Sequence, residues 1–263
     1  MKLAVLVALA ACAPAAAEAP DPVVAPAVAP AIAPALGPAI PAAAHQLITG
    51  VIADWGATRV TLRRWRRDGA TWIAVGTAWQ GVIGKGAAWG TGLHGAGAPS
   101  GHDGPTKHEG DGKSPAGAFA LRGSYGYAPR PPVHAVLPYT QVTAAWQCVD
   151  DAASSHYTQI VDRSLLAGAV DWTSAEAMRR RDALYTWVVD IAHNPSAQPG
   201  DGSCIFFHVW RDASSATVGC TAMPEAKLAR LLAGLDPSAV YVLLPRAEYD
   251  AFTAPWGLPP LGK

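Results

Sequence analysis

Two residues whose side chains suit nucleophilic catalysis lie close together late in the sequence. His208 belongs to the apolar run 204–209, and Cys220 follows after a short loop, directly behind Gly219. A thiolate is a strong nucleophile, and an imidazole can take the thiol proton and pass it to a leaving amine. A helix expected from Pro224 would direct its N-terminal dipole at the thiol and favour the thiolate. This pattern predicts acyl transfer, with buried structural residues as the alternative.

The elements that must position this pair are mainly strands. Alternating or β-rich apolar runs predict a hairpin turn at Asp68-Gly69 and strands at 46–53, 60–62, 71–75, 184–192, 204–209 and 239–244. The capping-box spacing from Thr173 to Glu176 predicts a helix over 173–183, and Pro224 begins a second helix with a leucine stripe. The Gly-rich stretch 81–117 is expected to be a long loop. We therefore expect a mainly β domain with a few short helices.

Three segments, in this order, resemble the YkuD-type L,D-transpeptidase family. They are Gly110–Phe119 (GDGKSPAGAF), the strand that carries His208, and Thr217–Met223 (TVGCTAM), which is most similar to the branch with a Gly-Cys-x-Ala-Met nucleophile segment. In looser form the resemblance extends from about His45 to Pro245. It implies an L,D-transpeptidase-like β-sandwich that acts on peptidoglycan stem peptides and needs no cofactor. In that family a cysteine attacks the L-centre carbonyl of a stem diamino acid and releases D-alanine. An amine of a second stem then resolves the thioester as a 3→3 cross-link.

The resemblance also implies roles for four residues. Cys220 matches the family nucleophile, and His208 matches its general base. By the same matching, Gly219 lies in the turn that presents the thiol, and Thr217 occupies the Ser/Thr position that helps to order the site. These positions define the expected catalytic centre.

Two positions of the nucleophile segment depart from the familiar motif. Val218 stands where a histidine is usual, and Ala222 stands where an arginine or asparagine is usual. Because those polar residues hold substrate or orient the site in the family, two alternatives stay open. One is an L,D-carboxypeptidase or amidase of the same fold, in which water resolves the thioester or another amide of the stem is cut. The other is a non-catalytic cell-wall-binding module.

Substrate contacts are expected from residues beside these motifs. Trp210 and Arg211 directly follow the base, where an aromatic ring can wall a cleft and a guanidinium group matches a carboxylate. Lys113 is a further candidate for a substrate carboxylate, and ordinary packing or a solvated charge is the alternative for all three. No metal is predicted, because tight ligand spacing is missing among the candidate ligands of the Gly-rich stretch, His94, His102, His108, Glu109 and Asp111.

The charge balance excludes nucleic acid as a partner. Lys and Arg total 20, and Asp and Glu also total 20, so the chain lacks the excess of cations that drives binding to phosphates. The arginine clusters at 63–67 and 179–181 are short and lie near acidic residues, which is typical of solvated faces. A length of 263 residues suits one sizeable core with appendages. We expect a monomer.

The first 44 residues are expected to be an export signal and a spacer. Residues 1–19 open with Met1-Lys2 and a short apolar run, and Cys12 ends a lipobox-like Leu-Ala-Ala-Cys, so both lipidation and ordinary cleavage are open. Residues 20–44 read as an Ala/Pro-rich linker, and residues 45–263 as the L,D-transpeptidase-like catalytic domain. The protein is therefore expected in the periplasm or cell envelope, with or without a lipid anchor.

The number of cysteines also supports Cys220 as the reactive thiol. If Cys12 is lipidated or removed, Cys148, Cys204 and Cys220 remain, and an oxidising compartment favours one bridge and one free thiol. A bridge from Cys148 to Cys204 would anchor the strand that delivers the base and leave Cys220 reactive. The alternative is that Cys148 and Cys204 are reduced core residues.

Overall fold

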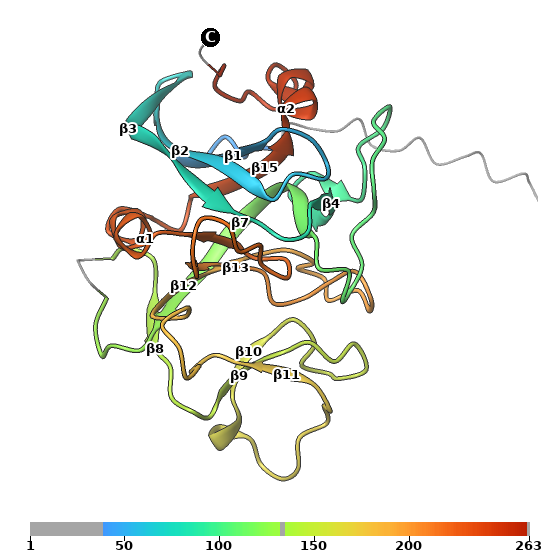
Figure 1. The fold of residues 1–263 in the computed structure, drawn as a ribbon, viewed down its shortest axis with the longest axis vertical. Coiled ribbons are helices and arrows are strands. Elements are labelled where there is room, and N and C mark those ends of the chain that lie inside the picture. Colours follow the sequence, from blue (N-terminus) through green and yellow to red (C-terminus); the bar gives the residue numbers. More distant parts are fainter. Residues whose placement is uncertain (1–38, 132–134, 262–263) are drawn as a thin grey trace, which may run out of the picture. The chain divides into compact units, whose positions relative to one another are not determined.

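The computed structural model describes residues 39–131 and 135–261. The expected export signal, the lipidation site at Cys12 and most of the expected linker lie outside the described residues. The described chain is mainly β, with a closed, sandwich-like large sheet, two small sheets and a few short helices (Figure 1), which confirms the predicted fold class at this level. Among the described residues, no helix is long and apolar enough to cross a membrane.

Most strands belong to the large sheet. They are β1 (Gln46–Ile52), β2 (Arg59–Asp68), β3 (Thr71–Val82), β4 (Ala87–Trp89), β7 (Ser114–Gly126), β8 (Tyr139–Gln141), β12 (Trp187–Ile191), β13 (Phe206–Val209), β14 (Thr221–Met223) and β15 (Val240–Pro245). The order is β12-β13-β14-β3-β2-β1-β15-β7-β4, with β8 beside β7, and β12 also pairs with β7. This last pairing closes the sheet. The long hairpin of β2 and β3 turns where the Asp-Gly pair predicts.

The core lies inside the closed sheet and under two short helices. Every residue of β15 is buried, as its continuous apolar run predicts. The two helices are α1 (Glu225–Leu232) and α2 (Arg246–Phe252), and α1 confirms the helix expected from Pro224. Together they bury Leu228, Leu231, Leu232, Tyr249 and Phe252.

Packing begins earlier in the chain than the composition suggests. Ala39, Ile40 and Ala44 are buried in the main core, although they lie in the expected 20–44 linker. The backbone N–H of Ala44 donates to the carbonyl of Pro41 in a turn. The boundary expected at His45 is therefore too late, because small apolar residues of an Ala/Pro-rich segment can still fill a core.

The lower part of Figure 1 shows a small sheet of β9, β10 and β11. β9 is the central strand and pairs antiparallel with both neighbours. A 3₁₀ turn, η1, follows β10. The bounds of these elements are β9 (Trp146–Val149), β10 (Ile160–Asp162), η1 (Arg163–Leu165) and β11 (Ala175–Ala177).

The helix predicted over 173–183 is wrong. The segment forms β11 and then turns, because both capping-box side chains are engaged elsewhere. Thr173 donates to Asp151 through its backbone N–H and its hydroxyl, and Glu176 accepts from the hydroxyl of Tyr185. Hydrogen bonds to residues outside the segment therefore override a local helix signal.

The Gly-rich stretch 81–117 is more regular than the predicted loop. It contains β4, the start of β7 and the two-residue strands β5 (Thr91–Gly92) and β6 (Gly95–Ala96). β4 pairs parallel with β7, so the glycines let backbone segments pack closely where side chains would collide. For example, a Cβ on Gly92 would lie 2.4 Å from the carbonyl oxygen of Ala118.

Candidate active site

Two hydroxyl groups hold the turn that ends at Cys220. Thr217 Oγ1 donates to the carbonyl of Cys220 at 2.6 Å and accepts from the backbone N–H of Gly219 at 3.2 Å. Ser114 Oγ donates to the carbonyl of Gly219 at 2.6 Å. Thr217 therefore orders the thiol-bearing turn. Sequence reasoning did not single out Ser114, although it lies within the GDGKSPAGAF segment.

Gly219 is required by the geometry of the same turn. Its φ is +145°, which L side chains rarely adopt. A Cβ at this position would lie 3.1 Å from Ile205 Cδ1 and 3.2 Å from the carbonyl oxygen of Lys113. Any larger residue would therefore push the thiol away from its place beside β13.

The environment of the Cys220 thiol differs from the expected one. The strand β14 separates Cys220 from α1, so the thiol does not lie at a helix N-terminus. It is buried, and its Sγ accepts from the backbone N–H of Phe206 at 3.3 Å. Burial, with a smaller contribution from the Glu176 carboxylate, raises the pKa of the Cys220 thiol well above its usual range. The resting residue is a thiol, because the hydrogen bond from Phe206 only partly offsets the loss of solvation.

His208 comes from β13, which pairs parallel with β14. Its Nδ1 lies 2.8 Å from the carbonyl oxygen of Val209, and a carbonyl can only accept. Nδ1 therefore carries the proton, and Nε2 holds the free lone pair. Burial lowers the pKa of His208 to about 4, so the imidazole is neutral at neutral pH and able to accept a proton.

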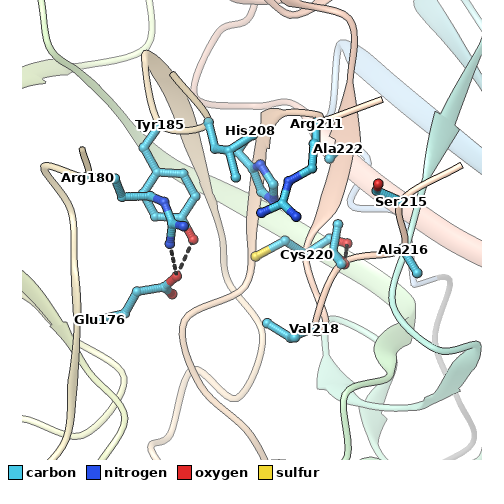
Figure 2. A pocket seen from close by; sticks show the side chains of 12 residues that line it. Glu176, Arg180, Tyr185, His208, Arg211, Ser215, Ala216, Val218, Cys220 and Ala222 are labelled. Atoms are coloured by element: carbon cyan, nitrogen blue, oxygen red, sulfur yellow. Dashed lines mark hydrogen bonds and ion pairs between the residues drawn. The ribbon is translucent and has the colours of Figure 1, made fainter. Parts of the chain in front are cut away.

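Cys220 and His208 line the same pocket, which has a volume of about 320 Å³ (Figure 2). Arg180 and Arg211 also line it. Arg180 is paired with Asp182 at 3.0 Å, whereas Arg211 is exposed and makes no ion pair with any residue in the described ranges. The pocket therefore brings together a thiol, a neutral imidazole and a guanidinium group that forms no ion pair among the described residues.

Two expected substrate contacts do not line this pocket. Trp210 follows the base, but its backbone N–H donates to the carbonyl of Met223 and its side chain is not part of the pocket wall. Lys113 contributes its backbone N–H to Asp111 Oδ1 at 2.8 Å, and its side chain lies outside both pockets that reach the thiol. Of the three residues expected to contact substrate, only Arg211 lines this pocket.

Residues that sequence reasoning missed complete the wall beside the thiol. Figure 2 shows Tyr185 next to His208, with Glu176 below its hydroxyl and the Arg180 guanidinium group beside it. The Tyr185 hydroxyl donates to Glu176 Oε1 at 2.5 Å, and its ring centroid lies 5.2 Å from that of His208. Arg180 lies over the Tyr185 ring. Sequence reasoning assigned Glu176 to a capping box and Arg180 to a solvated arginine cluster, so neither was expected at the site.

A second pocket, of about 300 Å³, also reaches the thiol. It shares Glu176, Val218 and Cys220 with the first pocket. The remainder of its wall contains five charged residues, Lys85, Lys107, Glu109, Asp111 and Asp150. The thiol therefore lies where two pockets of different charge meet.

Cys148 and Cys204 form a disulfide, with their Cα atoms 5.9 Å apart. The bridge joins β9 to the residues that lead into β13, and so anchors the strand that carries His208. Cys220 is the free cysteine of the described chain. The pairing favoured by the cysteine count is therefore the one in the structure.

Two histidines of the Gly-rich stretch have structural partners. His94 is buried with backbone groups of Gly90 and Ala118 at its ring nitrogens, and His102 Nδ1 lies 2.6 Å from Glu248 Oε2 of α2. Within residues 39–131 and 135–261, no group of three or more potential ligand side chains is arranged for a metal ion.

Comparisons of the chain with protein-family models, with curated proteins and with solved structures found no match. The chemistry therefore follows from the residues themselves. A thiol, a neutral imidazole and two pockets that meet at the sulfur suit transfer of an acyl group from one amide to a second acceptor.

Proposed function

We propose that the chain is a cysteine acyltransferase acting on peptidoglycan stem peptides, with the reaction and fold of an L,D-transpeptidase. One observation carries the proposal: Cys220, on a turn fixed by Thr217 and Ser114, lines one pocket together with His208. The Nδ1 of His208 is engaged by a backbone carbonyl, which leaves Nε2 as its unprotonated nitrogen. The closed, mainly β sheet that pairs β13 with β14 supports it.

The first half-reaction uses the neutral pair directly. Cys220 Sγ attacks the carbonyl carbon of the stem amide while His208 Nε2 takes the thiol proton. The tetrahedral intermediate collapses, the C–N bond breaks, and the same proton passes to the leaving amine of D-alanine. The products are a thioester on Cys220 and free D-alanine. Because the pKa of the thiol is raised, attack and proton transfer are expected to be coupled.

The charge of the first pocket supports a peptide substrate with free carboxylates. Arg211 has no ion-pair partner among the described residues and faces the pocket that holds the thiol. A guanidinium group binds a carboxylate through two parallel hydrogen bonds. Stem peptides end in D-alanine carboxylates, so Arg211 is the residue proposed to hold the donor stem in register.

The disulfide supports an exported enzyme. Bridges of this kind persist in oxidising compartments and are rare in the cytosol. We therefore place the catalytic domain in the periplasm or cell envelope as a monomer, with lipidation at Cys12 and ordinary signal cleavage as the two processing routes. No nucleic acid, metal or cofactor enters the proposed reaction.

Burial of the thiol favours one competing function, a wall-binding module without turnover. Cys220 is only 4% exposed, and its raised pKa makes it a poor nucleophile until a substrate orders the site. The two functions differ in the fate of a bound stem. A catalyst releases D-alanine, whereas a binding module holds the stem unchanged.

The test is product analysis with the mature domain and a tetrapeptide-stem muropeptide, followed by mass spectrometry beside Cys220→Ala. The transferase predicts D-alanine release and a cross-linked dimer, both lost in the variant. A trimmed tripeptide without dimer would identify an L,D-carboxypeptidase. Binding without any product from the unmodified protein would contradict catalysis and support the wall-binding module.

A further inference from the structure

The two pockets that meet at Cys220 differ in charge. The first carries Arg180 and Arg211, whereas the second carries carboxylates and two lysines. Glu176 lines both pockets, together with Cys220 and Val218. An acyl group on the sulfur would therefore be reachable from two sides, and Glu176 would lie beside it on either approach.

Internal pairing neutralises part of the second pocket. Lys107 Nζ forms an ion pair with Asp111 at 2.6 Å, and Glu109 Oε2 accepts from the hydroxyls of Tyr157 and Ser203. These contacts fix the pocket wall.

The buried atom of this pocket that remains without a partner belongs to a carboxylate. Asp150 Oδ1 is buried and has no hydrogen-bond partner among the described residues. A buried carboxylate oxygen without a partner is unfavourable unless a ligand supplies a donor. Lys85 is exposed at the edge of the pocket, where water screens its charge.

Glu176 has the environment of a base. Its Oε1 accepts from Tyr185, and Arg180 lies 3.7 Å from the same oxygen. Burial raises the pKa of Glu176, which increases its affinity for a proton. The carboxylate is thus held in one orientation at the junction of the pockets.

We propose that the second pocket binds the acyl acceptor, a primary amine that enters as its ammonium ion, and that Glu176 is the general base of the second half-reaction. The assignment rests on the proposed acyl-enzyme at Cys220. Asp150 supplies the missing partner for the ammonium group, and the arginines keep that cation out of the first pocket.

The step is balanced within the site. Glu176 takes one proton from the ammonium ion, and the resulting amine attacks the thioester carbonyl. An amide C–N bond forms, the C–S bond breaks, and the sulfur leaves as thiolate. The second proton lost by nitrogen passes through His208 to the thiolate, which restores the thiol. Glu176 then releases its proton to solvent.

The experiment separates the two half-reactions in the purified domain. A tetrapeptide-stem muropeptide is the donor, glycinamide is the acceptor probe, and intact-mass spectrometry follows the acyl-enzyme in rapidly quenched samples. The variants are Glu176→Gln and Asp150→Asn. Glu225→Gln, on the exposed start of α1, is the matched control.

Glu176→Gln is expected to affect the two half-reactions differently. Aminolysis should fall about 100-fold, within the usual range for loss of a general base. Acylation should be no slower, because the Glu176 charge raises the pKa of the thiol and the amide removes that charge. Asp150→Asn should raise KM for glycinamide about tenfold, a larger factor than its effect on kcat, and Glu225→Gln should match the unmodified protein.

Each other outcome has a defined meaning. Absence of any acyl-enzyme in the unmodified protein would overturn the proposed function and this assignment with it. An acyl-enzyme that both pocket variants resolve with glycinamide as the unmodified protein does would overturn the acceptor site alone. Equal slowing of acylation and aminolysis in Glu176→Gln would show a structural role and also reject the general base.

Discussion

Three histidines share a buried environment but differ in their free nitrogens. Burial lowers the pKa of His94, His193 and His208 alike to about 4. His94 and His193 have backbone partners at both ring nitrogens. His208 has a partner in the described chain only at Nδ1, and its ring faces the pocket that holds the thiol. Burial and a shifted pKa therefore do not single out His208, whereas an unpaired ring nitrogen on a residue that lines the pocket of the thiol supports its proposed role as the base.

The sharpest test of this contrast replaces one histidine of each kind. His208→Gln should slow acylation of Cys220 by about 10²–10⁴-fold, the usual effect of losing a general base, and should leave most of the stability intact. His94→Gln should leave the acylation rate of the folded protein unchanged and destabilise it by about 1–3 kcal/mol, because buried backbone groups lose a partner. Stopped-flow acylation and urea unfolding measure the two effects. If His208→Gln and His94→Gln lost the same acylation activity per amount of folded protein, the distinction between the two histidines would be wrong.

The disulfide anchors the strand that carries His208 but takes no part in the proposed acylation. Replacing both Cys148 and Cys204 by alanine should lower the free energy of unfolding by about 4 kcal/mol, since the bridge closes a sequence separation of 56 residues. At temperatures where the variant remains folded, acylation should persist, because neither cysteine lines the first pocket. Urea midpoints with and without reductant measure the stability effect. A variant as stable as the parent would contradict the anchoring role.

Acid should destabilise the fold through all three histidines. Their folded-state pKa of about 4 lies below the unfolded value of 6.5, so the unfolded chain takes up protons first. This stability is fully present above pH 6.5 and is lost as the pH falls from 6.5 towards 4, by about 3 kcal/mol per histidine at the acid limit. His94→Gln should show a shallower decline of urea midpoint across this window. An unchanged slope would show that His94 is protonated in the folded state.

A smaller effect is expected at the turn that presents the thiol. Thr217→Val removes the donor to the carbonyl of Cys220 and the acceptor for Gly219, and should slow acylation about tenfold by loosening the thiol. Thr221→Val, on the next strand, removes a buried contact with the hydroxyl of Tyr241 and serves as the matched control. It should affect stability more than rate. Similar acylation rates in Thr217→Val and Thr221→Val would show that Thr217 does not position the thiol.

Much of the sheet and the central pair could be predicted from sequence. β-rich runs gave the positions of β1, β13 and β15, the Asp-Gly turn marked the β2–β3 hairpin, and the leucine spacing marked α1. These signals are local, because side-chain period and turn chemistry act within a few residues. The Cys148–Cys204 pairing was expected because an odd number of cysteines leaves one thiol free and Cys220 was already the candidate reactive thiol.

The missed features depend on contacts between distant segments. The helix expected over 173–183 fails because Tyr185 and Asp151 take its capping groups. The expected dipole at Cys220 is absent because β14 completes the sheet before α1 begins. Ser114 supports the Gly219 carbonyl across a sequence separation of 105 residues. No periodicity in the sequence indicates contacts between distant segments. The roles of Glu176, Tyr185 and Ser114 around the thiol were therefore found only in the structure.

The most direct test of the account is acylation of Cys220 itself. The mature domain is mixed with a tetrapeptide-stem muropeptide, quenched at short times and measured by intact-mass spectrometry, with Cys220→Ala and His208→Gln alongside. The account predicts a covalent tripeptide-stem adduct on Cys220 together with one released D-alanine, absent in Cys220→Ala and strongly delayed in His208→Gln. No adduct and no D-alanine from the folded, reduced-thiol protein would contradict it.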